Sequence, residues 1–331
     1  MHGYDRSVPP IPLILVLGPT ASGKSALAAT LARELDGEVV SADAMAVYRD
    51  MDIGTAKPSP TELAAAPHHL ISVFAPHERC DVARWLALAD AAIAGIAARG
   101  RTAIVAGGSP LYTKALVEGL SAGAPRDEAV RAELNARYQR EGAAALFAEL
   151  TAVDPVYAAT RHANDQKRVV RALEVHRLTG KPYSSFHTTD GGARADYRTL
   201  PLGLWWPRAE LHRRINARAK AMFAAGLIDE VRALRGRLSP EAEQAVGYKE
   251  VLAHLAGEYD AERALELVRR NSRHLCKHQL TWYRRFRDIV WLRGDAPDLA
   301  ERGVALGRRF LAGDAVPPSP MPDDARPDDD R

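Results

Sequence analysis

The segment from Ile11 to Ser25 has the sequence IPLILVLGPTASGKS, and it decides the fold class. An apolar run, Ile11 to Leu17, is followed at once by the pattern Gly-x-x-x-x-Gly-Lys-Ser, from Gly18 to Ser25. The next residues, Ala26 to Leu35, are helix formers, so the segment predicts a strand, a glycine-rich turn and a helix. In such a turn the backbone N–H groups and the helix N-terminus attract phosphate oxygens, so the segment predicts a phosphate-binding loop.

The loop carries two further groups that suit a bound diphosphate. Lys24 adds a positive point charge, and the hydroxyl of Ser25 is the predicted ligand of Mg²⁺, which is the expected cofactor. The residues predicted to bind the diphosphate are Gly18, Pro19, Thr20, Ala21, Ser22, Gly23, Lys24 and Ser25.

Strands and helices alternate along the first third of the chain. Glu38 to Ser41 and Thr102 to Ala106 are further predicted strands, and Asp81 to Ala98 is an Ala-rich helix. We therefore expect an α/β fold in which a parallel sheet like that of P-loop NTPases is flanked by helices. Residues 1–120 and 200–312 form its predicted core with C-terminal helices, and residues 121–199, which lack a convincing strand, form a predicted helical insertion.

Composition excludes several other classes of protein. The chain has 331 residues, an ordinary balance of apolar and charged residues, and a formal net charge of +3. No apolar run is long enough to span a membrane, and the N-terminus lacks the apolar core of a signal peptide. Two distant cysteines, Cys80 and Cys276, form neither a disulfide framework nor a zinc motif, so we expect a cytoplasmic protein.

The last residues, 313–331, are rich in Pro and Asp, and we predict that they form a disordered acidic tail. Without this tail the rest of the chain is more basic than its formal charge suggests. A modestly basic body fits an anionic partner.

One feature argues against simple ATP hydrolysis. The strand Thr102 to Ala106 ends in Gly107-Gly108, where many ATP-hydrolysing enzymes place an Asp that organises Mg²⁺. The nearest acid at a strand end is Asp43. Its carboxylate fits a general base or a metal-supporting group, and it equally fits a helix N-cap. At this point a nucleotide-hydrolysing enzyme and a small-molecule kinase both remain open.

Several longer motifs are similar to one family. Asp43 to Pro58 resembles DSMQxYRGMDIGTAKP, Gly107 to Tyr112 resembles GGTxLY, and Asn164 to Val175 resembles NDxQRIxRALEV. Gly247 to Glu250 resembles GYKE, and Ser272 to Trp282 resembles TRxYAKRQxTW. With the loop GPTASGKS, these motifs occur in family order from residue 18 to about 285. The chain thereby resembles the tRNA dimethylallyltransferases, also called tRNA isopentenyltransferases.

The resemblance implies a reaction and two substrates. A dimethylallyl group passes from dimethylallyl diphosphate to N6 of adenosine 37, beside the anticodon of tRNAs that read codons beginning with U. The resemblance implies Asp43 as general base, with Lys24 and Ser109 as further catalytic residues. It implies the tRNA anticodon loop as partner, a monomeric enzyme, and neither a membrane nor an obligate protein partner.

The resemblance also suggests a set of tRNA contacts. The predicted residues are Asp43, Ala44, Met45, Ala46, Ser109, Arg131, Lys167, Arg168, Val169, Val170, Arg171, Gln244, Gly247, Tyr248, Lys249, Arg273 and Lys277. Ala44 and Ala46 depart from the pattern DSxQ, because a hydroxyl and an amide of the family are missing here.

Three alternatives share some of these features. An adenylate isopentenyltransferase would prenylate free AMP, ADP or ATP, but it would have little use for the helical insertion. A P-loop small-molecule kinase would transfer phosphate instead. A non-catalytic RNA-binding protein would have no need to keep Lys24, Ser25 and Asp43.

Overall fold

A computed structural model of the chain describes residues 9–120, 124–187 and 194–323. It divides into two compact units. One combines residues 1–117 with residues 195–331, and the other spans residues 118–194. Each unit is described by itself.

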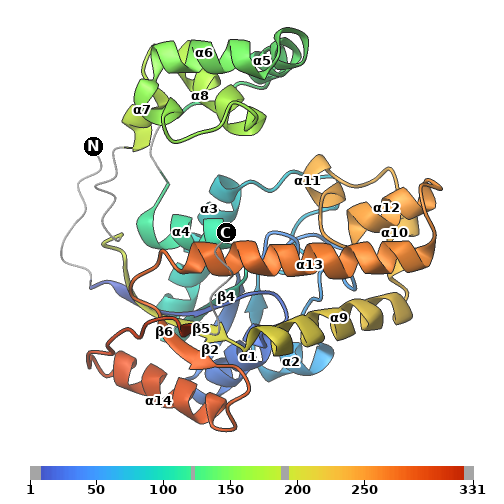
Figure 1. Cartoon of the computed structure of the whole chain (residues 1–331). Helices are drawn as coiled ribbons and strands as arrows, with labels where there is room; N and C mark the ends of the chain where they lie inside the picture. The colour runs from blue at the N-terminus through green and yellow to red at the C-terminus, as the bar shows by residue number, and fades with distance from the viewer. Residues whose placement is uncertain (1–8, 121–123, 188–193, 324–331) are drawn as a thin grey trace. The chain divides into compact units, whose positions relative to one another are not determined.

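The larger unit is built on a six-stranded sheet of order β3-β2-β4-β1-β5-β6 (Figure 1). The strands are β1 (Ile11–Leu17), β2 (Gly37–Ser41), β3 (His68–His69), β4 (Thr102–Gly107), β5 (Tyr197–Trp205) and β6 (Val290–Arg293). Every pair is parallel, with Leu13 opposite Ala103 and Ile11 opposite Tyr197. The parallel α/β fold predicted from the sequence is confirmed.

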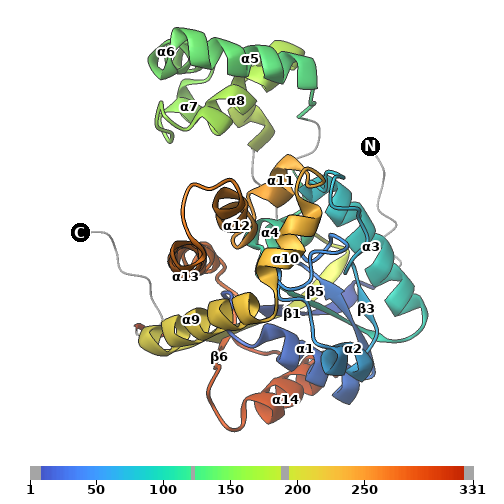
Figure 2. The same ribbon diagram turned by 90° about the vertical axis from the view of Figure 1, so that its right-hand side faces the viewer.

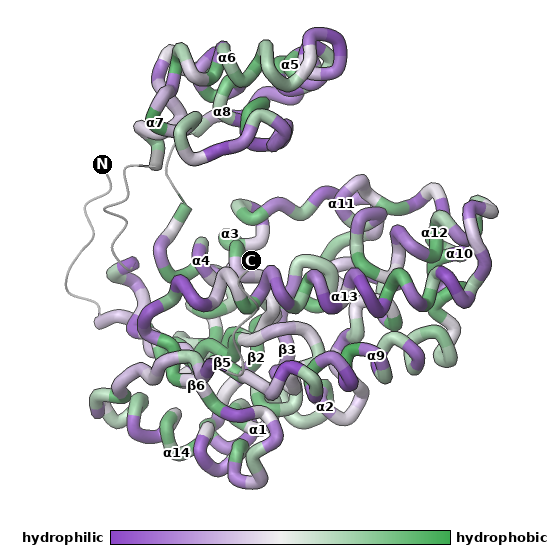
Figure 3. The backbone as a smooth tube through the Cα atoms, viewed as in Figure 1, coloured by the Kyte–Doolittle hydropathy of each residue, from purple (hydrophilic) through white to green (hydrophobic). Residues whose placement is uncertain are grey.

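Both faces of the sheet are covered, which explains the continuous apolar run in β1. Leu13, Leu15 and Leu17 belong to one hydrophobic core, and the alternate residues Ile14 and Val16 belong to the other. This is the period-2 alternation of a strand buried on both sides. The Leu13 face packs against α3 (Val82–Ala98) and α4 (Pro110–Glu118), and the Ile14 face packs against α1 (Lys24–Glu34) and α14 (Leu299–Leu311). Figure 3 shows the resulting mixture of hydrophobic and hydrophilic residues along α14.

A group of helices follows β5 and precedes β6. They are α9 (Arg208–Ala224), α10 (Leu227–Leu234), α11 (Pro240–Glu243), α12 (Tyr248–Leu255) and α13 (Ala261–Tyr283). In Figures 1 and 2, α9 and α13 lie side by side, and α10 and α12 lie next to each other. A short helix, α2 (Pro60–Ala65), precedes β3.

The strand ends explain where a site can form. Because β1, β2 and β4 are parallel neighbours or near neighbours, their C-terminal ends open on the same edge of the sheet. Gly18 follows β1, Asp43 follows β2 and Gly108 follows β4. The fold therefore gathers three of the segments that the sequence singled out.

The smaller unit is helical. Its elements are α5 (Glu128–Glu141), α6 (Ala143–Val153), α7 (Pro155–Ala158), α8 (Gln166–Thr179) and the 3-10 turn η1 (Tyr183–His187). Its own hydrophobic core includes Leu134, Leu150 and Leu173. The chain returns to the sheet at Tyr197, where β5 begins, slightly before the predicted residue 200.

Part of the segment predicted to be a disordered tail contacts the sheet. Ser319 donates its N–H to the carbonyl of Ile289 (3.0 Å), its hydroxyl accepts from the N–H of Trp291 (2.7 Å), and Met321 is buried. The physical reason is that β6 is an edge strand, whose unpaired backbone groups the tail satisfies. Residues 324–331 of the predicted tail lie outside the described residues.

Across the described ranges, no helix is both long and apolar enough to cross a lipid bilayer.

Candidate functional site

The phosphate-binding loop has the backbone shape that its glycines predict. Gly18 has a φ of +145°, and a Cβ there would lie 2.8 Å from the carbonyl oxygen of Leu204. Gly23 has a φ of +92° and caps the N-terminus of α1. Lys24 Nζ reaches across the loop and donates to the carbonyl of Pro19 at 2.7 Å. Only glycine suits the first two positions, since a side chain would be strained or would clash.

Residues just after β5 hold the loop from outside. Trp206 Nε1 donates to the carbonyl of Ser22 (2.9 Å), and Arg214 Nε donates to the carbonyl of Ala21 (2.9 Å). The Arg214 guanidinium also stacks on the Trp206 ring, 4.1 Å from its centroid. Because these contacts engage the loop carbonyls, the loop is held in one conformation before any ligand arrives.

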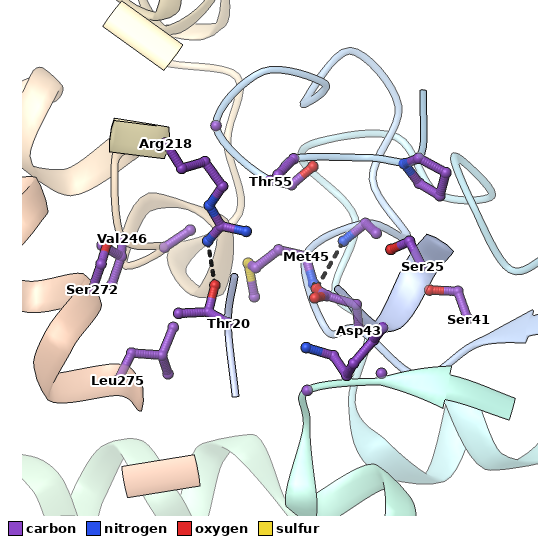
Figure 4. Close-up of a pocket in the computed structure, with 18 of the residues that line it drawn as sticks. Thr20, Ser25, Ser41, Asp43, Met45, Thr55, Arg218, Val246, Ser272 and Leu275 are labelled. Carbon is purple, nitrogen blue, oxygen red and sulfur yellow. Dashed lines mark hydrogen bonds between the residues drawn. The ribbon is translucent and has the colours of Figure 1, made fainter. Parts of the chain in front are cut away.

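The loop carries an excess of positive charge. Arg218, one helical turn after Arg214 on α9, donates to the hydroxyl of Thr20 (Figure 4). Burial and then the charge of Arg218 lower the pKa of Lys24 to about 8, although Asp43 partly opposes this. Burial likewise lowers the pKa of Arg218, again opposed by Asp43. Since a cation loses its proton more readily where negative charge is scarce, this arrangement is suited to bind an anion.

Gln279, from α13, joins the loop to the end of β4. Its Oε1 accepts from the N–H of Thr20 (2.8 Å), and its Nε2 donates to the carbonyl of Gly108 (2.6 Å). The hydroxyl of Tyr283 donates to the carbonyl of Gly107 at 3.2 Å. A Cβ on Gly107 would lie 2.1 Å from the carbonyl oxygen of Ala42, so this close approach of β2 and β4 requires glycine.

Asp43 has one engaged and one available oxygen. Its Oδ1 accepts from the N–H of Met45 (2.8 Å) and of Ala46 (3.2 Å), which is the local capping role considered from the sequence. Among the described residues, its Oδ2 accepts no hydrogen bond. The carboxylate lines the same cavity as Lys24 and Arg218 (Figure 4), so the capping role leaves it able to accept a proton from a ligand.

These groups surround a cavity of about 180 Å³. Its polar lining includes Thr20, Lys24, Ser25, Ser41, Asp43, Thr55, His68, Arg218, Ser272 and Gln279, and its apolar lining includes Met45, Ile215, Met222, Val246, Val268 and Leu275. A second hollow, of about 490 Å³, lies against the loop and is also lined by Lys24, Ser25 and Arg218. A ligand with an anionic head and a short apolar chain matches the lining of the cavity.

The donor set for Mg²⁺ is sparse but adequate for a metal that arrives with a phosphate. The described residues contain no group of three His, Cys, Asp or Glu side chains that could hold an ion. The hydroxyl of Ser25 and the Oδ2 of Asp43 both face the cavity region. Mg²⁺ usually keeps waters and binds through one or two protein oxygens plus substrate phosphates, so these residues fit it.

The predicted tRNA contacts of the larger unit differ in exposure. Met45 and Ala46 line the cavity, whereas Ser109 follows Gly108 at the start of α4 and is not among the lining residues. Gln244 and Lys249 are exposed, but Gly247 and Tyr248 are buried. Arg273, on α13, donates to Asn216 of α9 at 2.6 Å, and Lys277 is partly buried one turn further.

The predicted tRNA contacts of the smaller unit are partly structural. Val169 and Val170 belong to its core. Arg131 and Arg171 both bind the fully buried carboxylate of Glu174, at 2.8 Å each, and Arg171 also holds the carbonyls of residues 124 and 125. Burial alone would raise the pKa of Glu174, but the two guanidiniums hold it below its usual range.

The two remaining predicted contacts of this unit, Lys167 and Arg168, are both exposed. Arg168 pairs with Asp165 at 2.5 Å. The predicted RNA-binding role of this unit stays a prediction.

Comparison with known proteins agrees with the motifs. The sequence model of the family described as IPP transferase matches residues 46–286, and that of isopentenyl transferase matches residues 11–71. The tRNA dimethylallyltransferase of Anaeromyxobacter sp. (strain K) is 50% identical over 301 residues, which are 90% of this chain and 97% of that protein. This chain belongs to the IPP transferase family.

Other IPP transferases show the same relationship. The tRNA dimethylallyltransferase of Geobacter metallireducens is 46% identical over 283 residues, 85% of this chain and 92% of that protein. The solved full-length tRNA isopentenylpyrophosphate transferase of Bacillus halodurans has a TM-score of 0.66 and 39% identity, and covers 91% of this chain and 96% of its own. A solved structure of a eukaryotic dimethylallyltransferase acting on tRNA has a TM-score of 0.79 and 26% identity. It covers 92% of this chain and 81% of its own.

The IPP transferase motifs in the sequence did not identify several residues of the site. Arg214, Arg218 and Glu230 lie between the quoted motifs, and Gln279 lies inside one without a role assigned to it. One signal was present, because Arg214 and Arg218 are four residues apart in the first helix, Arg208–Ala224, after a parallel strand. That spacing places both on one helix face at the edge of the sheet where the site forms.

Proposed function

We propose that this chain transfers the dimethylallyl group of dimethylallyl diphosphate to N6 of adenosine 37 in tRNAs that read codons beginning with U. One observation carries the proposal. A glycine-rich loop with Lys24 lines a cavity that Arg218, several apolar side chains and the carboxylate of Asp43 also line. The names of the relatives, tRNA dimethylallyltransferase, support the same substrates.

The loop stabilises the leaving group. The allylic C1–O bond of the donor breaks, and its electron pair leaves with the diphosphate. The loop N–H groups, Lys24 and Arg218 surround the oxygens on which this charge develops. Preorganised donors of this kind lower the barrier because they need no rearrangement as the charge grows.

Asp43 takes the proton of the nucleophile. The lone pair of N6 forms the new bond to C1, and one N6 proton must leave, because the exocyclic amine is a weak nucleophile. The available Oδ2 of Asp43 accepts that proton, while Oδ1 remains fixed by the N–H groups of Met45 and Ala46. The hydrogen bonds to Oδ1 hold the carboxylate in one orientation throughout.

Mg²⁺ supports this chemistry when it is bound. Ser25 would hold it beside the diphosphate, where it would supply Lewis-acid stabilisation of the leaving group. Lys24 and Arg218 contribute positive charge of their own at the same place.

The RNA must present its base outside the stack. Adenosine 37 is stacked in the anticodon loop, so extrusion costs on the order of a few kcal/mol. Contacts to the RNA must offset this cost. The exposed Gln244 and Lys249, in the segment around Val246 of the cavity wall, are candidates for such contacts.

Label transfer tests the proposal. The protein is incubated with Mg²⁺, dimethylallyl diphosphate labelled in the prenyl group, and either unmodified tRNA or AMP. We expect label on tRNA alone, and mapping of the modified nucleoside to position 37. Label on AMP but not on tRNA would identify an adenylate isopentenyltransferase, and transfer of the terminal phosphate of ATP with no prenyl transfer would identify a kinase.

Asp43→Asn tests the base. The amide keeps an oxygen for the N–H groups of Met45 and Ala46 but is no longer a base. We expect kcat to fall about 10³-fold with unchanged tRNA binding, within the range of general-base effects. Asp36→Asn, at an exposed surface ion pair with Arg101, is the matched control and should leave kcat unchanged. Equal loss in both variants would remove Asp43 from the role.

A further inference from the structure

One carboxylate holds a wall of the cavity from outside. Glu230, in the first turn of α10, accepts hydrogen bonds from three successive backbone N–H groups. Its Oε2 accepts from Asp52 (2.9 Å) and Ile53 (2.7 Å), and its Oε1 accepts from Gly54 (3.0 Å). The hydroxyl of Tyr248, at the start of α12, also donates to Oε1. Four donors therefore converge on one side chain, and charge-assisted bonds of this type are the strong ones.

The segment at 52–54 packs so closely against its neighbours that Gly54 has no room for a side chain. A Cβ on Gly54 would lie 2.4 Å from Cε2 of Tyr248 and 2.9 Å from Cδ1 of Leu227. Tyr248 and Leu227 are both fully buried. Gly54 thus lies flat against the Tyr248 ring while its N–H points to Glu230, and the two interactions together set its position.

The other end of the same loop is also fixed. Lys57 Nζ donates to the carbonyl of Tyr48 (2.6 Å), to Oδ1 of Asp52 (2.6 Å) and to the hydroxyl of Ser72 (2.7 Å). Several residues in and beside the anchored segment face the cavity: Gly54, Thr55, Ala56 and Pro58 are all part of its lining. Gly54 is the lining residue whose backbone Glu230 binds directly, and Thr55 and Ala56 follow it in the chain.

A second carboxylate ties the adjoining wall to α13. Gly247 donates its N–H to Oε2 of Glu250 (2.7 Å), and Asn271 Nδ2 donates to Oε1 (2.6 Å). Val246, just before Gly247, lines the cavity, as does Ser272, just after Asn271. The loop at 52–54, the segment at 246–248 and α13 therefore form one connected wall, in which Glu230 is the link to the loop.

We propose that Glu230 is a positioning residue that fixes the depth of the prenyl pocket and so selects a five-carbon diphosphate over longer ones. The inference rests on the proposed prenyl transfer. Without the carboxylate, three adjacent N–H groups lose their acceptor, and the loop at 52–56 moves away from Tyr248 to find water. The pocket then lengthens, while Lys24 on α1 stays in place and Asp43, earlier in the same β2–α2 connection, stays fixed by the N–H groups of Met45 and Ala46.

The test compares two prenyl donors in three variants. Glu230→Gln replaces two acceptor oxygens by one and turns an NH₂ group toward the backbone N–H groups. Tyr248→Phe removes only the hydroxyl and keeps the ring against Gly54. Glu258→Gln, an exposed position in the turn after α12, is the matched charge control. Each variant is assayed with full tRNA and either dimethylallyl or geranyl diphosphate.

We expect selectivity to fall. The ratio of kcat/KM for dimethylallyl over geranyl diphosphate should drop about tenfold in Glu230→Gln and about threefold in Tyr248→Phe, in line with a charged and a single hydrogen bond. The loss should appear as a raised KM for dimethylallyl diphosphate at nearly constant kcat. Glu258→Gln should match the unchanged protein.

A merely structural role gives a different result. Val304→Ala, which thins the core under α14, lowers the melting temperature without touching this wall, and it should leave the ratio unchanged. If Glu230→Gln and Tyr248→Phe behave like Val304→Ala, the inference is overturned. If Glu230→Gln does not fold, the ratio of kcat/KM measured for Tyr248→Phe alone tests the inference. Absence of any prenyl transfer by the unchanged protein would instead refute the proposed function.

Discussion

The arginines of the phosphate-binding loop and those of the helical unit differ in how their charge is balanced. In the helical unit, Arg131 and Arg171 share the buried carboxylate of Glu174, which they neutralise. Beside the loop, Arg218 has Lys24 as a neighbour, and the charge of Asp43 opposes the lowering of both pKa values. The charges in the helical unit are balanced without a ligand, whereas those beside the loop have an excess of positive charge.

The difference teaches what a cluster of arginines means in a sequence. Arg131 and Arg171 were predicted from the sequence as contacts to an anionic partner, whereas Arg218 was not among the predicted residues. A guanidinium that already binds a buried carboxylate contributes to folding, and removing it leaves an uncompensated charge. A guanidinium without such a partner costs stability until an anion arrives. Substitution of Arg131 or Arg171 should therefore lower the stability of the fold, whereas substitution of Arg218 should weaken ligand binding without lowering stability.

The largest effect is expected for Arg218→Gln. Loss of this charge beside the leaving group should lower kcat/KM for dimethylallyl diphosphate by about 10²- to 10³-fold, as for loss of one preorganised donor. The melting temperature should stay the same or rise, since repulsion with Lys24 is relieved. Arg213→Gln, which removes an exposed ion pair with Glu210 on the same helix, is the control. A large drop in melting temperature with normal kcat/KM would reverse the comparison.

Next in size is the effect of Arg131→Leu on stability. It leaves Glu174 with Arg171 as its remaining guanidinium, and we expect the free energy of unfolding to fall by about 3 kcal/mol. Because the pKa of Glu174 is held low, its stabilising contribution is present above the ordinary value of 4.5 and is lost as pH falls through the lowered value. The difference between variant and unchanged protein should therefore narrow in acid.

Denaturant unfolding at pH 7 and pH 3 measures this effect. Arg177→Leu, at the surface pair with Glu133, should cost less than about 1 kcal/mol and serves as control. Arg131 would be a ligand-binding residue and not a folding residue if the two variants were equally stable.

The third effect is a pH dependence at the loop. Because the pKa of Lys24 is about 8 without ligand, the protonated form that binds a diphosphate is depleted as pH rises above 8. The KM for dimethylallyl diphosphate should then rise by up to about tenfold per pH unit, with little change between about pH 6 and 7.5. Lys24→Arg should shift this rise to higher pH, since a guanidinium keeps its proton. A KM for dimethylallyl diphosphate that stays constant from about pH 7 to 9.5 would contradict the excess of positive charge at this site.

The smallest effect is expected on α13. Arg273 donates to a neutral amide, Asn216, so its charge remains available to a phosphate. Changing Arg273 and Lys277 together to Ala should weaken tRNA binding and reduce the salt slope by about 0.7–0.9 for each phosphate that is no longer neutralised. Arg302→Ala with Arg308→Ala on α14, over the other face of the sheet, is the control pair. An unchanged slope would assign this part of α13 to the ordinary surface.

Prediction from sequence succeeded where the signal is local. The strand β1, the glycine turn and the start of α1 are contiguous, so their residues specify the fold of that segment together. The position of Asp43 after β2 followed from the rule that parallel strands open on one edge. The contact between Ser319 and β6 was not predicted, because the sequence did not indicate that strand.

The sequence by itself determined the parallel α/β class, the turn from Gly18 to Gly23 and the family motifs, because each depends on neighbouring residues. Only the tertiary structure decided which charged side chains serve a ligand and which serve the fold. Arg218 and Arg171 are the same residue type in similar helices, and the difference lies in Glu174, which binds Arg171. Glu230 is distant in sequence from the N–H groups at 52–54 that it binds. Charge balance depends on distances through space, and chain folding alone sets those distances.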